Sequence, residues 1–396
     1  MTQFKIPENI IKVLDILEEN GYEAYVVGGC VRDMCRGVTP HDYDVTTSAL
    51  PEETKACFDG FRVIETGIKH GTVTVISDGD PVEITTYRTD GEYRDNRHPV
   101  SVSFTPKLEL DLSRRDFTVN AMAYSPKRGI VDVFGGRDDL DAHVIRCVGE
   151  PDRRFGEDGL RILRALRFAS CLDFNIDADT SESILKNKHL LENISAERVC
   201  AELFRLVTGK GAERILLSYE PVMRLIIPSA FAHDYSAAVC AVGASEPELI
   251  LRLSLLFGSP DGASDLEKLK SDGASQRAVR AVTSLAQMKL TDRASIRRVL
   301  RRNGADLVAR AIEMQYITGA IDENEKNRLV LILDEAKTDC VTPAMLAVGG
   351  ADVMAMGVAE GKGVGEALEK LLELVITDAV PNDRDALLDA LSRMKG

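Results

Sequence analysis

The chain has 396 residues, of which 44% are hydrophobic and 28% charged, and it contains no tryptophan. A chain this long is expected to form about two to four domains, and its composition excludes an intrinsically disordered protein. The formal net charge of −14 argues, as a global number, against a nucleic-acid partner.

Three further classes are excluded by local sequence. No apolar run approaches the ~18 residues of a membrane span, and the N-terminus lacks the apolar core of a secretory signal. The eight cysteines are scattered, with no Cys-x-x-Cys spacing, which favours reduced thiols over a disulfide framework or a zinc site. We therefore expect a cytoplasmic protein without a membrane partner, and no obligate protein partner is evident.

The first third of the chain predicts mixed α/β structure. A helix is expected between Pro7 and Gly21, followed by a strand at 22–27 that runs into a glycine pair. Further strands are expected at 61–65, 71–77, 82–87, 117–124 and 130–134, and a polar loop at 91–99.

After about residue 145 the apolar spacing becomes helical, and strands are no longer evident. Helices are expected at 160–172, 184–191 and 199–206, and helical patterns continue almost to the C-terminus. The fold class predicted from these patterns is α+β, with a small mixed sheet in a head that is followed by all-helical segments.

The first chemical motif joins Gly28-Gly29 and Arg32 to an Asp-x-Asp at Asp42 and Asp44. Paired glycines let the backbone approach a triphosphate, whose charge suits the start of the following helix. In a strand the two carboxylates would share a face, as Mg²⁺ bound with substrate phosphates requires. Taken singly, a glycine turn and a polar loop would explain the same residues.

The second motif is Arg114-Arg115-Asp116 before an expected strand. Its guanidinium forks could bind phosphate or ribose, or could form an internal salt bridge.

The third motif runs from Glu157 to Phe168, where Asp158, Arg161, Arg164 and Arg167 recur every three residues on an expected helix. It is either an amphipathic helix with surface ion pairs or a base-recognition stripe. In the second case Arg would donate to ring acceptors and Asp would accept from the amino group of cytosine or adenine.

Together these motifs resemble the class II tRNA nucleotidyltransferases, the bacterial-type CCA-adding enzymes of the polymerase-β superfamily. The resemblance covers residues 20–210 and is supported by the stretches 66–75 and 83–88. It implies a polymerase-β-like head at 1–145, a base-recognising neck at 146–210, and a body at 211–320 and tail at 321–396 that bind tRNA.

The same resemblance implies a role for each motif residue in adding CCA to tRNA from CTP and ATP, by two-metal transfer with release of pyrophosphate. Phosphates would be bound by Gly29 and Arg32, and Mg²⁺ by Asp42 and Asp44. Arg115 would position ribose and triphosphate. Asp158 and Arg161 would select C or A, in a pocket completed by Arg164 and Arg167. Glu83 is a candidate third carboxylate.

The sequence departs from relatives that carry a helical phosphohydrolase domain after the neck. His233-Asp234 is present, but Phe257-Gly258 stands where a second His-Asp pair would be expected. One pair is a poor basis for a dinuclear centre, so we expect no phosphatase activity.

Four alternatives are weighed against a complete CCA-adding enzyme. A poly(A) polymerase shares the head, but the basic arms expected for long RNA are missing, and the loop at 93–104 resembles the element used to switch from C to A. The same loop argues against a CC-only enzyme. Intact Asp42 and Asp158 argue against an inactive RNA-binding relative, and the long helical body argues against a small-molecule nucleotidyltransferase.

Charge is unevenly distributed along the helical segments. Residues 277–310 contain nine basic side chains and two acidic ones, whereas 322–396 contain fifteen acids and eight bases. Such a basic segment can follow a phosphate backbone, although a solvated helix face is the plainer interpretation. The candidate RNA-binding residues are Arg297, Arg298, Arg301 and Arg302.

Overall fold

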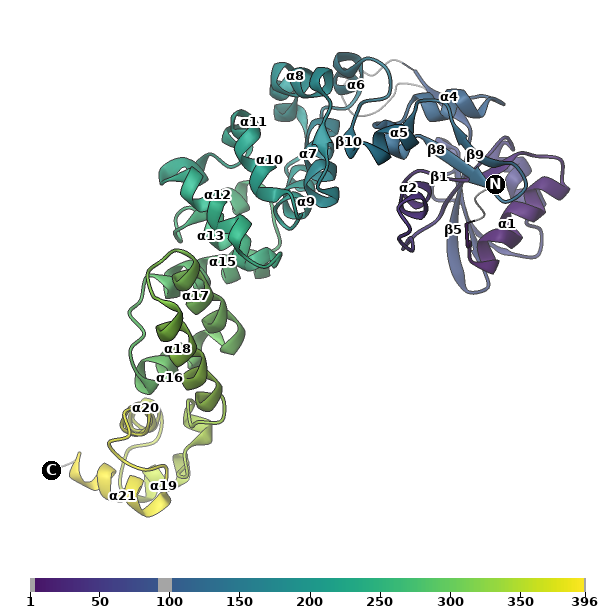
Figure 1. Ribbon diagram of the computed structural model, residues 1–396. Helices are drawn as coiled ribbons and strands as arrows, with labels where there is room; N and C mark the ends of the chain where they lie inside the picture. Colours follow the sequence, from purple (N-terminus) through teal and green to yellow (C-terminus); the bar gives the residue numbers. More distant parts are fainter. Residues whose placement is uncertain (1–3, 92–101, 395–396) are drawn as a thin grey trace. The chain divides into compact units, whose positions relative to one another are not determined.

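The computed structural model describes residues 4–91 and 102–394, and it divides into two compact units, Met1–Ile226 and Ile227–Gly396 (Figure 1). Each unit is described by itself. Among the described residues, no helix has the length and apolarity that a bilayer crossing requires.

The first unit begins with a seven-stranded sheet in the order β3-β4-β5-β2-β1-β8-β9. Within it β2 and β5 run parallel, and the other neighbouring pairs are antiparallel. The strands are β1 (Ala24–Val27), β2 (Asp44–Thr47), β3 (Arg62–Ile64), β4 (Thr72–Ser77), β5 (Asp80–Thr86), β8 (Met122–Ser125) and β9 (Gly129–Asp132). A separate antiparallel pair is formed by β6 (Arg88–Asp90) and β7 (Val102–Phe104).

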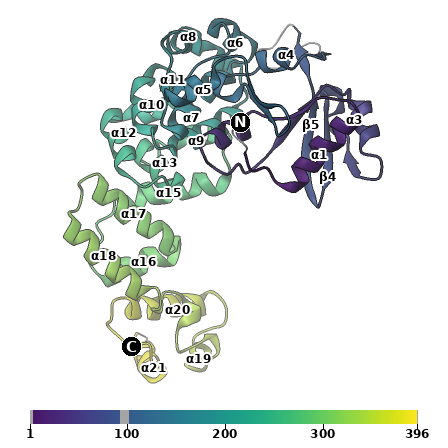
Figure 2. The same cartoon turned by 45° about the vertical axis from the view of Figure 1, so that its right-hand side comes forward.

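Strands β1 and β8 are buried on both faces of the sheet, and successive residues of each strand point to opposite sides. Val26 of β1 belongs to the main core with α1 and α2, whereas Val27 belongs to a smaller cluster with Leu112 of α4. Figure 2 shows α1 beside β4. The helices of this region are α1 (Glu8–Glu19), α2 (Gly29–Cys35), α3 (Pro51–Cys57), α4 (Leu108–Ser113) and α5 (Gly136–Asp141).

Helices make up most of the rest of the first unit. They are α6 (Pro151–Glu157), α7 (Leu160–Leu172), α8 (Ala178–Asn187), α9 (Ala196–Val207), α10 (Ala212–Ser218) and α11 (Glu220–Ile226). The expectation of no strands here is wrong at one point, since β11 (Asn175–Ile176) pairs in parallel with β10 (Val144–Ile145). Helices α7 and α9 pack together, and a Cβ added at Gly209, just after α9, would lie 2.2 Å from Oγ of Ser170 in α7.

The described part of the second unit is helical throughout. Its α-helices are α12 (Tyr235–Ala244), α13 (Leu249–Phe257), α14 (Ser264–Lys268), α15 (Gly273–Ala286), α16 (Arg293–Asn303), α17 (Ala305–Ile317), α18 (Glu323–Ala336), α19 (Gly350–Ala355), α20 (Lys362–Ile376) and α21 (Arg384–Arg393). Short 3-10 turns across the two units lie at Ile68–His70, Thr118–Asn120, Lys188–Asn193, Pro228–Ala232 and Pro343–Met345. The predicted class, a small mixed sheet followed by helices, is confirmed.

Candidate functional site

The glycine pair forms the turn between β1 and α2. Gly28 has a φ of +84°, which favours glycine, and a Cβ added there would lie 3.0 Å from Nη1 of Arg115. Gly29 begins α2. The turn therefore brings the first motif and Arg115 of the second motif together.

The carboxylates of the first motif line one cavity of about 630 Å³. Asp44 is the first residue of β2, and the pairing of Val45 with Ile84 places Glu83 of β5 beside it. The sequence had predicted that Asp42 lies within the strand. It precedes β2 instead, yet it lines the same cavity. The structure thus brings together all three carboxylates that the sequence singled out.

The electrostatics of this cavity suit a cation. Partial burial raises the pKa of Asp44 above its ordinary value; Arg115 opposes the rise, and the nearby Asp42 adds to it. A divalent cation would relieve the repulsion between the two carboxylates, and their oxygens are the ligands that Mg²⁺ prefers. No group of three or more His, Cys, Asp or Glu side chains in the described ranges is arranged to hold a metal.

The second motif forms internal ion pairs. Asp111, which the sequence analysis missed, is fully buried and accepts from Nη2 of Arg114 at 2.8 Å and Nη2 of Arg115 at 3.4 Å. Asp116 accepts from Nε and Nη2 of Arg164 in α7, at 2.8 and 2.6 Å. Burial alone would raise the pKa of Asp116, but Arg164, Arg161 and Asn120 together more than offset it, so the pKa lies below its usual value.

The third motif differs from its prediction in one respect. Arg161, Arg164 and Arg167 lie on α7, but Asp158 lies before that helix, in extended backbone between α6 and α7. One of its oxygens, Oδ1, accepts from the Leu160 amide at 3.0 Å. The polar stripe therefore comes from a helix and the turn that precedes it.

Asp116 of the second motif holds Arg164, whereas the other three charged side chains are held by residues to which the sequence analysis assigned no role. Glu157 accepts from Nη1 of Arg161 at 2.6 Å, and Arg161 is only 9% exposed. Glu202 of α9 accepts from Arg167. Arg198 of α9 donates to Oδ2 of Asp158 at 2.9 Å. Helical spacing could have suggested Glu157, whereas the partners from α9 are distant in sequence.

Phe168 gathers three guanidinium groups. The carbon at the centre of each guanidinium lies 5.3 Å from the ring centroid for Arg32, 5.4 Å for Arg164 and 3.7 Å for Arg167. Arg32 also donates to Oδ1 of Asn120 at 2.8 Å. The phosphate-binding candidate of α2 is thus beside the arginines of α7.

The four arginines predicted to bind RNA have different surroundings on α16. Arg297 is buried and donates to Oδ2 of Asp339 at 2.6 Å and to the Ile376 carbonyl at 2.9 Å, so its expected place on an exposed basic face needs correction. Acidic residues of α20 pair with two others, Arg298 with Glu373 and Arg301 with Glu369. Arg302 is exposed and forms no ion pair with any residue the structure describes.

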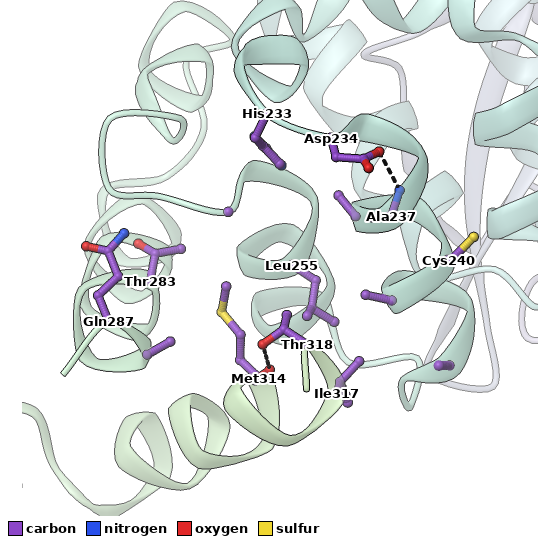
Figure 3. Close-up of a pocket in the computed structure, with 15 residues that line it drawn as sticks. His233, Asp234, Ala237, Cys240, Leu255, Thr283, Gln287, Met314, Ile317 and Thr318 are labelled. Atoms are coloured by element: carbon purple, nitrogen blue, oxygen red, sulfur yellow. Dashed lines mark hydrogen bonds between the residues drawn. The ribbon is translucent and has the colours of Figure 1, made fainter. Parts of the chain in front are cut away.

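The single His-Asp pair of the second unit lines a largely apolar cavity of about 770 Å³ (Figure 3). Asp234 caps α12 by accepting from the Ala237 amide at 3.0 Å. Gly258 lies against His233, because a Cβ there would be 2.9 Å from Nε2 of that histidine. The carboxylate therefore has a structural role, and the expected lack of phosphatase activity stays a prediction. Most of the loop at 93–104, which bears on the choice between C and A addition, lies outside the described residues.

The fold and the site together define the class of protein. A small mixed sheet with a glycine turn and paired carboxylates, joined to helices by Arg164, is the arrangement of a nucleotidyltransferase head and neck. Family descriptions agree: residues 24–146 match "Poly A polymerase head domain", 173–225 a probable RNA and SrmB-binding site of polymerase A, and 244–391 a tRNA nucleotidyltransferase domain 2.

Relatives identify the family. The chain is 36% identical to the CCA-adding enzyme of Ligilactobacillus salivarius over 98% of both chains, and 35% identical to that of Lactobacillus helveticus over 97% of both. The Bacillus stearothermophilus CCA-adding enzyme, solved in complex with CTP, has a TM-score of 0.82 at 30% identity over 98% of both chains. The Thermotoga maritima enzyme complexed with tRNA shares the fold, with a TM-score of 0.69 at 20% identity over the full length of both chains. The chain belongs to the class II CCA-adding enzymes, a family of tRNA nucleotidyltransferases that depend on a divalent metal.

Proposed function

We propose that this chain adds CCA to the 3′ end of tRNA, using CTP and ATP and releasing pyrophosphate. The observation that carries the proposal is the Asp116–Arg164 contact, which joins the carboxylate-bearing head to the helix that bears Arg161. Relatives solved with CTP and with tRNA support the choice of substrates.

Asp42 and Asp44 would hold Mg²⁺ in this proposal, and Glu83 is the candidate third carboxylate of their cavity. When bound, two such ions would promote ionisation of the tRNA 3′-hydroxyl and stabilise charge on the leaving pyrophosphate. The chain itself contributes position and fixed charge, which account for most of the catalysis of phosphoryl transfer.

Phosphate binding would come from the Gly28-Gly29 turn and the basic cluster around Phe168. Gly29 leaves room for the triphosphate at the start of α2, and Arg32 lies near that start. Arg115 would position ribose and triphosphate from the other side of the turn. Guanidinium groups suit this work because each can donate two parallel hydrogen bonds to phosphate oxygens.

Base selection would rest on Asp158 and Arg161, with Arg164 and Arg167 completing the nucleotide pocket. The Asp158 carboxylate accepts from the amino group that cytosine and adenine both carry, and Arg161 donates to ring acceptors. Uracil and guanine would present a carbonyl oxygen to the carboxylate, which repels it. Burial of Arg161 and its fixation by Glu157 suit a group that must hold one geometry.

The second unit would bind tRNA, with Arg298, Arg301 and Arg302 as the candidate phosphate contacts of α16. Arg302 is the strongest candidate because it is exposed and needs no acidic partner displaced. The four-part division at residues 145, 210 and 320 is retained as the proposed assignment of these functions.

The test is incubation of tRNA lacking CCA with each nucleotide singly and with CTP and ATP together, followed by measurement of product length. Addition should stop after three residues; long A tails would indicate a poly(A) polymerase, and two C residues a CC-only enzyme. Asp44→Asn should abolish incorporation, whereas Asp80→Asn, which alters another acid of the same cavity, should retain it. Retained turnover in D44N would refute the metal role, and no turnover in the unaltered protein would favour an inactive RNA-binding relative.

A further inference from the structure

The Asp158 carboxylate has two hydrogen-bond partners of different kinds, a backbone amide and an arginine side chain. Oδ1 accepts from the Leu160 amide, a backbone contact that many acidic residues make before a helix. Oδ2 accepts from Nη2 of Arg198, in the first turn of α9, at 2.9 Å. Arg198 is the only side chain in the described ranges that hydrogen-bonds to Asp158.

Arg198 is partly buried beside Asp158, and one of its terminal nitrogens lacks a hydrogen-bond partner among the described residues. Its side chain is 27% exposed, and its Nη1 is buried without a hydrogen-bond partner in the part of the chain that the structure describes. Leaving a buried donor without a partner is unfavourable. The hydrogen bond to Asp158 is therefore the contact that the terminal nitrogens of Arg198 make within the described part of the chain.

We propose that Arg198 is the positioning residue for Asp158 and thereby sets the preference for bases that carry an amino group. The inference rests on the proposed function, because it assumes that Asp158 contacts the base. Arg198 acts through Asp158 and does not itself touch the nucleotide in this proposal.

Arg198 would affect the rejection of a carbonyl group by Asp158 as much as the acceptance of an amino group. An ionised carboxylate has about four lone-pair positions, and its two partners take one on each oxygen. The remaining positions then face fixed directions, so an amino group is accepted and a carbonyl is repelled. Without Arg198 the carboxylate could turn away from a carbonyl oxygen, and uracil or guanine would be rejected less strongly.

The experiment is a double-mutant cycle of Arg198→Met and Asp158→Asn, with the full chain and tRNA lacking CCA. The readouts are the kcat/KM ratios of CTP to UTP and of ATP to GTP, together with the Tm of each variant. R198M should lower both ratios roughly tenfold, the scale expected for one hydrogen bond to a charged group. In the D158N background the same change should lower them no further, because residues that act as one unit are not additive.

Two further variants separate positioning from general damage. Arg198→Lys keeps a positively charged donor group and should recover most of the selection that R198M loses. Arg205→Met removes an exposed arginine from the same helix and should leave both ratios unchanged. If R198M does not fold, Arg198→Gln takes its place in the same cycle.

The proposal is overturned if R198M keeps the ratios of the unaltered protein, or lowers them equally in both backgrounds. Unchanged selection in D158N would instead refute the base-selecting role of Asp158, and with it the proposed function on which this inference rests. Lower Tm with intact ratios would assign Arg198 a structural role only.

Discussion

Replacing Arg297 by methionine is expected to destabilise the second unit without removing an RNA contact. The side chain of Arg297 is 9% exposed and that of Asp339 is 13% exposed, so their ion pair is largely shielded from water. Asp378, a third partner at 2.7 Å, is 69% exposed and adds little. The loss therefore falls mainly on the contacts with Asp339 and the Ile376 carbonyl, since the contact with the Val375 carbonyl is long, at 3.4 Å.

The magnitude follows from these two hydrogen bonds. Each hydrogen bond to a charged group contributes about 1.5–3 kcal/mol, but Arg293 continues to hold Asp339 at 2.6 Å, which limits the cost of the carboxylate left behind. We expect R297M to lower the free energy of unfolding by about 2–4 kcal/mol. For a unit of this size the Tm should then fall by roughly 5–10 °C.

Arg302→Met is the matched control, because Arg302 lies on the same helix and is exposed. Circular dichroism should show a lower Tm for R297M and an unchanged one for R302M. Binding of tRNA over a range of salt concentrations should show the opposite: R302M should reduce the slope of log K against log salt by about 0.7–0.9, as expected for one lost phosphate contact. Equal Tm values for the two variants would refute the assignment of Arg297 to the interior.

Three other changes test the first unit. Asp44→Asn should leave the free energy of unfolding unchanged or slightly raised in the absence of metal, because solvent weakens the repulsion between Asp42 and the exposed Asp44 carboxylate; a clearly destabilised D44N measured in urea would contradict this. Gly209→Ala should destabilise by about 1–3 kcal/mol or more through its clash with Ser170, whereas Gly156→Ala, in open space, should not; equal urea midpoints would argue against the close approach. Hydrogen bonding from Lys186 and other groups lowers the pKa of Asp152 to about 2, below its value in the unfolded chain. The contribution of Asp152 to the free energy of unfolding should therefore be present above about pH 4 and lost as the pH falls toward 2. A stability difference between the unaltered protein and Asp152→Asn that grew with acid would refute this.

Local sequence predicted best where one element carries its own signal. The apolar spacing at 160–172 predicted both ends of α7, and the Asp-x-Asp motif identified two carboxylates that line one cavity. The resemblance to CCA-adding enzymes then supplied the family, which the relatives confirm. These features depend on neighbours within a few residues, which a single sequence displays.

What the sequence could not show were partners brought together by packing. A run of arginines on α16 looks the same whether solvent or α20 faces it, so the burial of Arg297 was hidden. Likewise nothing near Asp158 in sequence indicates Arg198, forty residues later. Buried charges need partners, but which acid meets which base is decided only by the tertiary fold.

The contact between Asp116 and Arg164 has a consequence for how accurately nucleotides are selected when the protein is warmed. In a polymerase that copies a strand, the instructions are a separate molecule that survives when the enzyme is heated. Here the instructions would be side chains whose alignment depends on α7 staying packed, so fidelity becomes a property of folding. Mild warming that loosens the packing of α7 should therefore cause wrong nucleotides to be added to tRNA before it stops nucleotide addition. The highest temperature at which the enzyme works correctly would then be set by these errors instead of by loss of turnover.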